Sequence, residues 1–342
     1  MPNTKTYKLP FILLSLLLVV CFFVNVSLGS ISIPTKEIFK SLIGPIDNDS
    51  WYYIIQNYRL PKAFTAILVG SGLGISGLLM QTLFRNPLAG PFVLGISSGA
   101  SLGVAIVILG AGVFGGVFTT LLLSKWSVVI AASLGSFLVL LAVLAVSSKV
   151  RDTMAILIIG LMFGSITAAV VSVLSYFSSA EKLQQYIFWG FGSLGNLSWY
   201  ELMIFTIIYG FGLVLSVVSI KALNTLLLGE NYAKSLGLNI KKNRLIIIVA
   251  TSLLAGTITA FAGPIAFIGL AIPHMVRQIF TTSNHKILLP AVFLFGAMVM
   301  LICDSIAQLP TSDYTLPINA ITSLIGAPVV IWLLVRKRKM LF

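Results

Sequence analysis

Apolar residues in this chain gather into ten long runs separated by short polar connections. The runs cover residues 10–28, 62–83, 92–115, 126–147, 153–178, 201–220, 245–262, 265–281, 287–307 and 317–335. A helix needs about 20 predominantly apolar residues to cross the hydrocarbon core of a bilayer. The pattern therefore predicts an all-α polytopic membrane protein with about ten transmembrane helices.

Composition supports a membrane protein. Of the 342 residues, 58% are hydrophobic and only 9% are charged, whereas a soluble domain carries about 25% charged residues. Ten helices use about 200 residues, so we expect a single transmembrane domain over residues 1–342 with short connections. A cleaved signal peptide is the alternative interpretation of residues 1–30. Cys21 and Cys303 indicate neither a disulfide framework nor a metal site.

Positive charge is concentrated on alternate connections. If the N-terminus is cytoplasmic, sixteen of the 22 Lys and Arg residues lie inside. The six on the outer side are Lys36, Lys40, Arg59, Lys62, Lys125 and Lys182. Cytoplasmic connections are enriched in Lys and Arg, so both termini are predicted to be cytoplasmic. The positive charge lies near membrane ends, including Arg336–Lys339, which favours anionic lipid over nucleic acid as its partner.

Two motifs suggest chemistry that their context does not support. Gly72, Gly74 and Gly77 match GxGxxG, but they lie within an apolar run and not between a strand and a helix. We interpret them as small residues that let helices approach closely. His274 has no neighbouring ligand residues in the sequence and is interpreted as structural. The chain has no Walker sequence, so it does not bind ATP through a P-loop of its own.

Acidic residues are placed unfavourably for ion coupling. Intramembrane ionisable groups usually mark ion or proton pathways, yet all nine acids lie in connections or near the ends of runs, Asp304 being the most interior. This placement argues against an ion-coupled secondary transporter that works without an ATPase, which is the alternative function we weigh.

Small residues repeat every four positions in the fifth run. Gly160, Gly164, Ala168 and Ser172 form a smooth stripe along one helical face. The stripe is interpreted either as ordinary helix packing or as the lining of a wide path or subunit interface. Ala89–Pro91 and Ala262–Pro264 have the same sequence, Ala-Gly-Pro, and follow two runs of opposite direction, which suggests an inverted repeat.

The connection over residues 228–237 is predicted to be a short helix closed by Gly237. Glu230 and Lys234 lie one turn apart and are able to pair. Tyr232 and Leu236 form an apolar edge that a solvated loop has no reason to display. The edge favours a protein partner; a helix lying on lipid is the alternative.

Several sequence blocks in order resemble the FecCD family of ABC permeases over almost the whole chain. The blocks are Arg59–Lys62, Asn86–Ala89, Leu94–Ala100, Leu228–Gly237, Phe267–Arg277 and Ile325–Pro328. The resemblance implies a permease subunit of an ATP-driven importer in the bacterial cytoplasmic (inner) membrane. It implies a path for a metal chelate, namely a ferric siderophore, haem or cobalamin, and no covalent chemistry in this chain.

The resemblance also implies partners and site residues. A second permease copy would complete the path, lined by the fifth run. Two ATPase subunits, which bind ATP and Mg, would dock on a coupling segment at about 222–243. Its implied contact residues are Leu228, Gly229, Glu230, Tyr232, Ala233, Lys234, Leu236 and Gly237. A periplasmic or lipid-anchored substrate-binding protein would dock on Arg59 and Lys62.

Two positions depart from the family pattern. Gln308 stands where relatives often carry an arginine shortly after the aspartate, which here is Asp304, and this would remove one docking charge. Asn319 replaces the usual glycine near the start of the last run and would place an amide near the outer mouth of the path.

Overall fold

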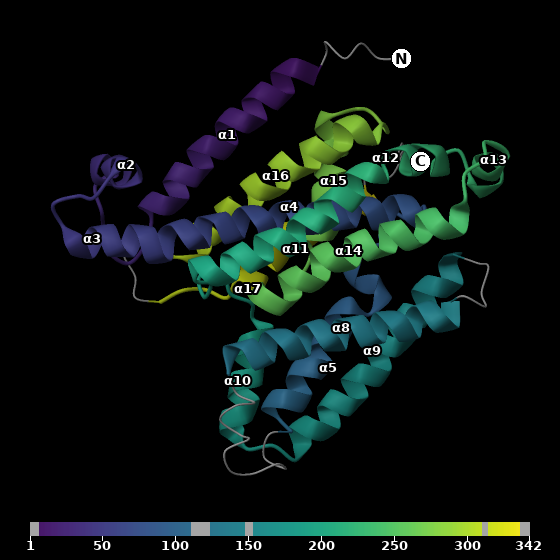
Figure 1. Cartoon of the computed structure of the whole chain (residues 1–342), viewed down its shortest axis with the longest axis horizontal. Coiled ribbons are helices and arrows are strands. Elements are labelled where there is room, and N and C mark those ends of the chain that lie inside the picture. The colour runs from purple at the N-terminus through teal and green to yellow at the C-terminus, as the bar shows by residue number, and fades with distance from the viewer. Residues whose placement is uncertain (1–6, 111–123, 148–152, 310–313, 336–342) are drawn as a thin grey trace.

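The structure is a computed structural model that describes residues 7–110, 124–147, 153–309 and 314–335. Within these ranges the chain is helical and contains no strand (Figure 1). This confirms the predicted all-α class. The end of the predicted run 92–115 and the basic residues Lys5, Lys149, Arg151 and Arg336–Lys339 lie outside the described residues.

Seven described helical segments are long and apolar enough to cross a membrane. Six of them are single helices: α1 (Lys8–Ser27), α8 (Lys125–Ser147), α9 (Thr153–Tyr176), α11 (Trp199–Val218), α14 (Ile240–Ala262) and α16 (His285–Ala307). The seventh is continuous from Asp49 to Leu83 and consists of α3 (Asp49–Ile54), a π-turn (Ile55–Arg59) and α4 (Leu60–Leu83). Each coincides within a few residues with a predicted run, except that α3 and the π-turn extend the second one toward the N-terminus.

The remaining three predicted runs form shorter helices. They are α5 (Ile96–Ile108), α15 (Ile268–Ile279) and α17 (Ile318–Val335). The predicted starts at residues 92 and 265 are wrong because the backbone there is not α-helical. Pro91–Leu94 form a 3₁₀ turn that ends at Gly95, whose φ is +75°. Phe267, at the end of an irregular stretch, has a φ of +65°, and neither left-handed residue continues an α-helix.

Short helices occupy several connections. They are α2 (Thr35–Ile43), α10 (Ala180–Gly190), α12 (Ile220–Leu226) and α13 (Glu230–Ser235). Only the last was predicted. The start of α11 is fixed by a capping box in which Ser198 and Glu201 exchange side-chain and backbone hydrogen bonds.

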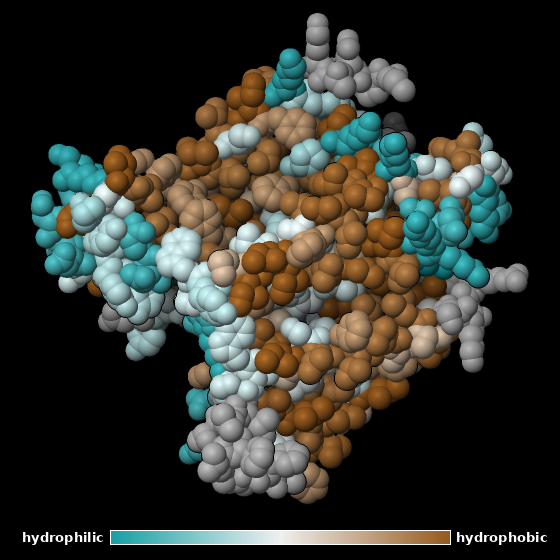
Figure 2. All heavy atoms as spheres, in the orientation of Figure 1, coloured by the Kyte–Doolittle hydropathy of each residue, from teal (hydrophilic) through white to brown (hydrophobic). Residues whose placement is uncertain are grey.

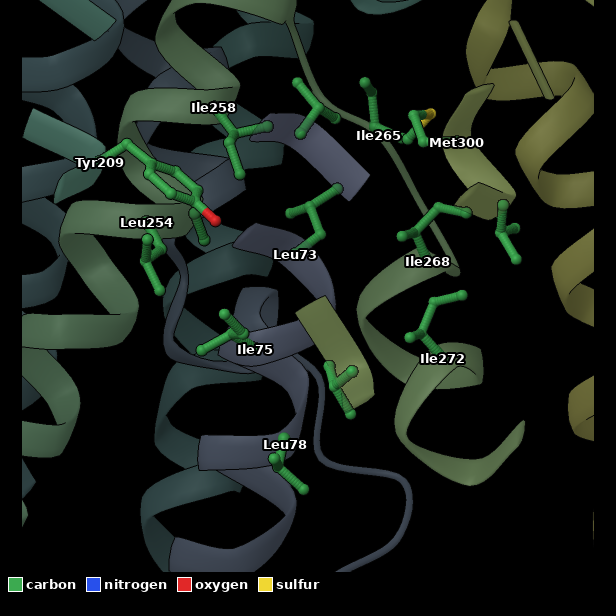
Figure 3. Packing of buried hydrophobic residues seen from close by; sticks show 14 of the residues in the cluster. Leu73, Ile75, Leu78, Tyr209, Leu254, Ile258, Ile265, Ile268, Ile272 and Met300 are labelled. Atoms are coloured by element: carbon green, nitrogen blue, oxygen red, sulfur yellow. The ribbon is translucent and has the colours of Figure 1, made fainter. Parts of the chain in front are cut away.

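The helices form two adjoining groups (Figure 1). In one group α5, α8, α9 and α10 pack together, while α4 lies in the middle of the other, against α11, α14, α15 and α16. In the apolar 18-residue window of the segment that contains α4, 83% of the residues are buried. Leu73, Leu78, Ile272, Tyr209 and Met300 all belong to this core (Figure 3). A long helix is followed by a short one in α4–α5 and again in α14–α15, the two places where the Ala-Gly-Pro sequence occurs.

Glycines bring backbones into contact along α4. A β-carbon at Gly70 would overlap the carbonyl oxygen of Gly296 in α16, and one at Gly77 would overlap that of Gly269 in α15. The GxGxxG stretch is therefore a helix-packing face, as predicted.

The two ends of the molecule differ from its middle. Apolar side chains cover much of the surface between the ends, whereas hydrophilic ones gather over α2–α3 at one end and α12–α13 at the other (Figure 2). At the α3 end, Trp199 donates to the carbonyl of Gln56 over 2.8 Å and Trp126 packs on Tyr200. Such aromatic residues are typical of a membrane–water interface.

Candidate functional site

The α12–α13 segment is an exposed projection at one end of the molecule (Figure 1). Gly229, with a φ of +101°, begins α13. At its other end the N–H of Gly237 bonds the carbonyl of Lys234 over 2.9 Å, and that of Leu238 bonds Ala233 over 3.0 Å. These two bonds form a Schellman motif, which favours glycine at position 237 because its φ is +81°. The predicted helix and its glycine stop are confirmed.

The outer face of α13 is apolar. Leu228, Tyr232 and Leu236 are each more than half exposed, whereas Ala233 is fully buried against the body of the protein. Three large apolar side chains in and beside α13 are thus exposed on its outer face. The apolar edge predicted from the sequence is present.

Glu230 has a different partner from the one its spacing suggests. Its Oε1 accepts from Arg244 of α14 over 2.7 Å, rather than from Lys234. Arg244 lies near the start of α14 and reaches across the segment that links α13 to α14. It therefore pairs with Glu230 in place of Lys234, the partner within α13. The ion pair fixes α13 to a transmembrane helix.

An open groove of about 640 Å³ lies between α13 and the end of α4. Its walls are Leu83, Phe84, Arg85, Leu228, Gly229, Glu230, Asn231, Tyr232 and Ser235. Apolar residues such as Leu228 and Tyr232 lie beside polar ones such as Asn231 in this groove, and Arg85 adds an exposed cation. A partner that fills the groove needs both apolar and polar groups, and acidic groups near Arg85 would favour its binding.

The opposite end contains the two basic residues assigned to docking. Arg59 is buried, and its guanidinium donates to the carbonyls of Val26 and Ser27 over 2.9 Å each and to that of Ile31. The expectation that Arg59 faces outward is wrong for this structure, because the guanidinium satisfies carbonyls left free where α1 ends.

Lys62 remains partly exposed and pairs with Asp304 over 3.2 Å. Asp304 also accepts from Asn25 over 2.9 Å and from Gln308 over 2.8 Å. The departure at Gln308 therefore supplies an amide that stabilises a buried carboxylate. An open cavity of about 490 Å³ adjoins Lys62 and Asp304.

The small-residue stripe of α9 divides into two halves. A β-carbon at Gly160 would overlap the carbonyl of Val93, and Gly164 faces Ser98, so this half is a packing surface. Ala168 and Ser172 are exposed and leave a smooth surface open. Asn319 accepts from the backbone N–H of Ala266 over 3.0 Å, so its amide holds the irregular stretch before α15 instead of standing free.

His274 has a structural contact, and no group of metal-binding side chains is seen. His274 lies 2.7 Å from the carbonyl of Pro87, in agreement with the structural interpretation. Among the residues that the structure describes, no three His, Cys, Asp or Glu side chains are grouped closely enough to hold a metal ion.

The apolar helices long enough to cross a membrane, together with an exposed apolar helix at one end, define a polytopic membrane protein. Comparison with known proteins identifies its family. Residues 17–336 match the FecCD transport family, and the chain belongs to that family.

Curated relatives are similar over nearly their whole length. The chain is 33% identical over 327 residues to the hemin transport system permease protein HmuU of Yersinia pestis, covering 95% of each. It is 38% identical over 328 residues to the vitamin B12 import system permease protein BtuC of Klebsiella pneumoniae, covering 95% of this chain and 93% of BtuC.

A solved structure of an inward-facing metal-chelate type ABC transporter has the same fold. It superposes with a TM-score of 0.83 at 32% identity, covering 96% of this chain and all of that one. These comparisons show a permease of the ABC-importer class and give no support to an ion-coupled transporter working alone.

Proposed function

We propose that this chain forms half of the path through which an ABC importer carries a metal chelate, with haem, cobalamin and a ferric siderophore as the candidate cargoes. The observation that carries the proposal is the exposed apolar face of α13, fixed to α14 by Glu230 and Arg244. Transport of haem by HmuU and of vitamin B12 by BtuC supports the cargo class.

The proposed assembly has two permease copies and two ATPase subunits, each ATPase docking on one α13. ATP and Mg bind to those subunits, and this chain catalyses no covalent reaction. The exposed half of the α9 stripe, at Ala168 and Ser172, is proposed to face the path or the second copy. α13 and both termini are cytoplasmic in this proposal, which the basic residues Arg85, Lys234 and Lys242 on the α13 side support.

Uptake measurements in the host bacterium test the cargo. We expect deletion of this chain to abolish uptake of one of the three chelates, and its return on a plasmid to restore uptake. Labelled cobalamin is measured first, since loss of its uptake identifies a corrinoid cargo. If cobalamin uptake is unchanged, uptake of haem and of ferric siderophores is measured next. If uptake of all three is unchanged, in a strain without a second system for them, the proposal is contradicted.

Docking of a substrate-binding protein is proposed at the end that carries Lys62. The two basic residues there are expected to behave differently. Arg59→Gln removes the donor for three carbonyls and should lower the free energy of unfolding by about 1–3 kcal/mol, measured as a lower Tm in detergent. Lys62→Gln should weaken binding of the substrate-binding protein, and that effect should shrink in high salt. If Arg59→Gln alone weakens binding and leaves the Tm unchanged, the two roles are reversed.

A further inference from the structure

A buried hydrogen-bond chain joins α12 to two transmembrane helices. The Oδ1 of Asn224, on α12, accepts the backbone N–H of His285 over 2.9 Å and lies 2.8 Å from its Nδ1. His285 begins α16, and its Nε2 lies 2.8 Å from the hydroxyl of Thr82 near the end of α4. His285 and Thr82 have no exposed surface. The chain thus connects three helices through one imidazole ring.

The direction of these bonds follows from their donors. A backbone N–H only donates, so the Asn224 atom facing His285 is its oxygen, and Nδ1 must carry a proton to meet it. In the neutral ring Nε2 then carries no proton. The Thr82 hydroxyl lies 2.8 Å from Nε2 and 3.0 Å from the carbonyl of Leu78, and it has one proton for these two acceptors. The amide nitrogen of Asn224 donates to Asn284 over 3.0 Å. Removing the Thr82 hydroxyl therefore takes away a partner of the buried Nε2.

α12 lies between the exposed helix α13 and the transmembrane helices. Its side chains Ala222, Leu223 and Leu226 are buried, and α12 packs against both α4 and α16. Only residues 227–229 separate it from α13. A displacement of α13 by a partner would reach α12 through this short link, and Asn224, His285 and Thr82 offer a route from there to α16 and α4.

We propose that His285 is the positioning residue that transmits movement of α13 to α4 and α16, so that ATP hydrolysis by the partner is converted into opening and closing of the path. This inference rests on the proposed function. Spatial connection alone is not coupling, so the test measures coupling itself.

The test compares Thr82→Val, which keeps the shape but removes the hydroxyl, with Thr82→Ser, which keeps the hydroxyl. Complexes of the full chain with its ATPase subunits are reconstituted in proteoliposomes. The binding protein is supplied loaded with the chelate identified by the uptake measurements. We expect the number of cargo molecules transported per ATP hydrolysed to fall about 2- to 30-fold in Thr82→Val and to return to nearly the wild-type value in Thr82→Ser. A purely structural role would reduce the amount of folded complex without changing this ratio.

Thr251→Val is the matched control. Thr251 is a fully buried threonine of the transmembrane helix α14, as Thr82 is of α4, but its hydroxyl bonds the carbonyl of Ile247 in its own helix. The ratio should stay unchanged in this variant. Asn224→Ala combined with Thr82→Val should lower the ratio no further than the stronger single variant, because both break one chain. An unchanged ratio in Thr82→Val, or an equal fall in Thr251→Val, would overturn the inference. Failure of the wild-type chain to bind its ATPase would instead overturn the proposed function.

Discussion

Gly77→Ala will prevent this protein from folding normally. The new β-carbon would overlap the carbonyl oxygen of Gly269, which is backbone and has no rotamer to change. α4 is packed by other helices on several sides, so it cannot shift away without opening contacts elsewhere. Overpacking of this kind costs about 3 kcal/mol or more when the neighbour is rigid. We expect little monodisperse protein after detergent extraction and a markedly lower Tm in what remains.

Gly210→Ala is the control for this substitution. Gly210 also lies within a transmembrane helix, α11, but apart from the backbone of its own helix no described atom lies within 4 Å of the position its β-carbon would take. Because alanine favours a helix over glycine by about 1 kcal/mol in water, this variant should be as stable as the wild type or slightly more so. Equal Tm values for the two variants would show that the α4–α15 contact tolerates a methyl group.

Leu236→Asp will separate this permease from its ATPase. Leu236 is 60% exposed, so its replacement leaves the fold intact while placing a charge on the apolar face of α13. Loss of a central apolar contact at an interface costs about 2 kcal/mol or more, which corresponds to roughly a 30-fold weaker association. We expect co-purification with the ATPase and cargo uptake to fall together, with the Tm of the isolated permease unchanged.

Leu88→Asp is the matched comparison for the α13 variant. Leu88 is also an exposed leucine in a connection, in the segment after α4, but it does not line the groove beside α13. This variant should bind the ATPase as the wild type does. Full ATPase association and transport by Leu236→Asp would refute the coupling role of α13.

The hydropathy pattern of the sequence was sufficient to predict the positions of most of the transmembrane helices. Their apolar runs are long, so each start and end is fixed by the position where polar residues appear. The pattern failed at the predicted starts at residues 92 and 265, where the apolar run has begun but the α-helix starts only at Ile96 and Ile268. Hydropathy does not report on backbone dihedral angles, and Gly95 and Phe267 end or delay the helices through positive φ values.

The site could be predicted as far as its contacts are local. The apolar face of α13 follows from the spacing of Tyr232 and Leu236 on one helix. The partner of Glu230 and the burial of Arg59 depend on residues far along the chain, which spacing does not reveal. The same limit applies to His285 and Thr82, which are 203 positions apart. Their only signal in the sequence is the presence of polar side chains at the ends of apolar runs.

The uninterrupted helical segment Asp49–Leu83 has a further consequence for the cell envelope. Its 35 residues span about 52 Å at 1.5 Å per residue, whereas the hydrocarbon core is about 30 Å thick. Even with a moderate tilt, the segment is longer than the hydrocarbon core, so α3 and its tyrosines would extend into the headgroup layer. In the proposed assembly, a substrate-binding protein that docks at this end would meet rigid helix at the height of the headgroups, and it would not need to reach into the hydrocarbon.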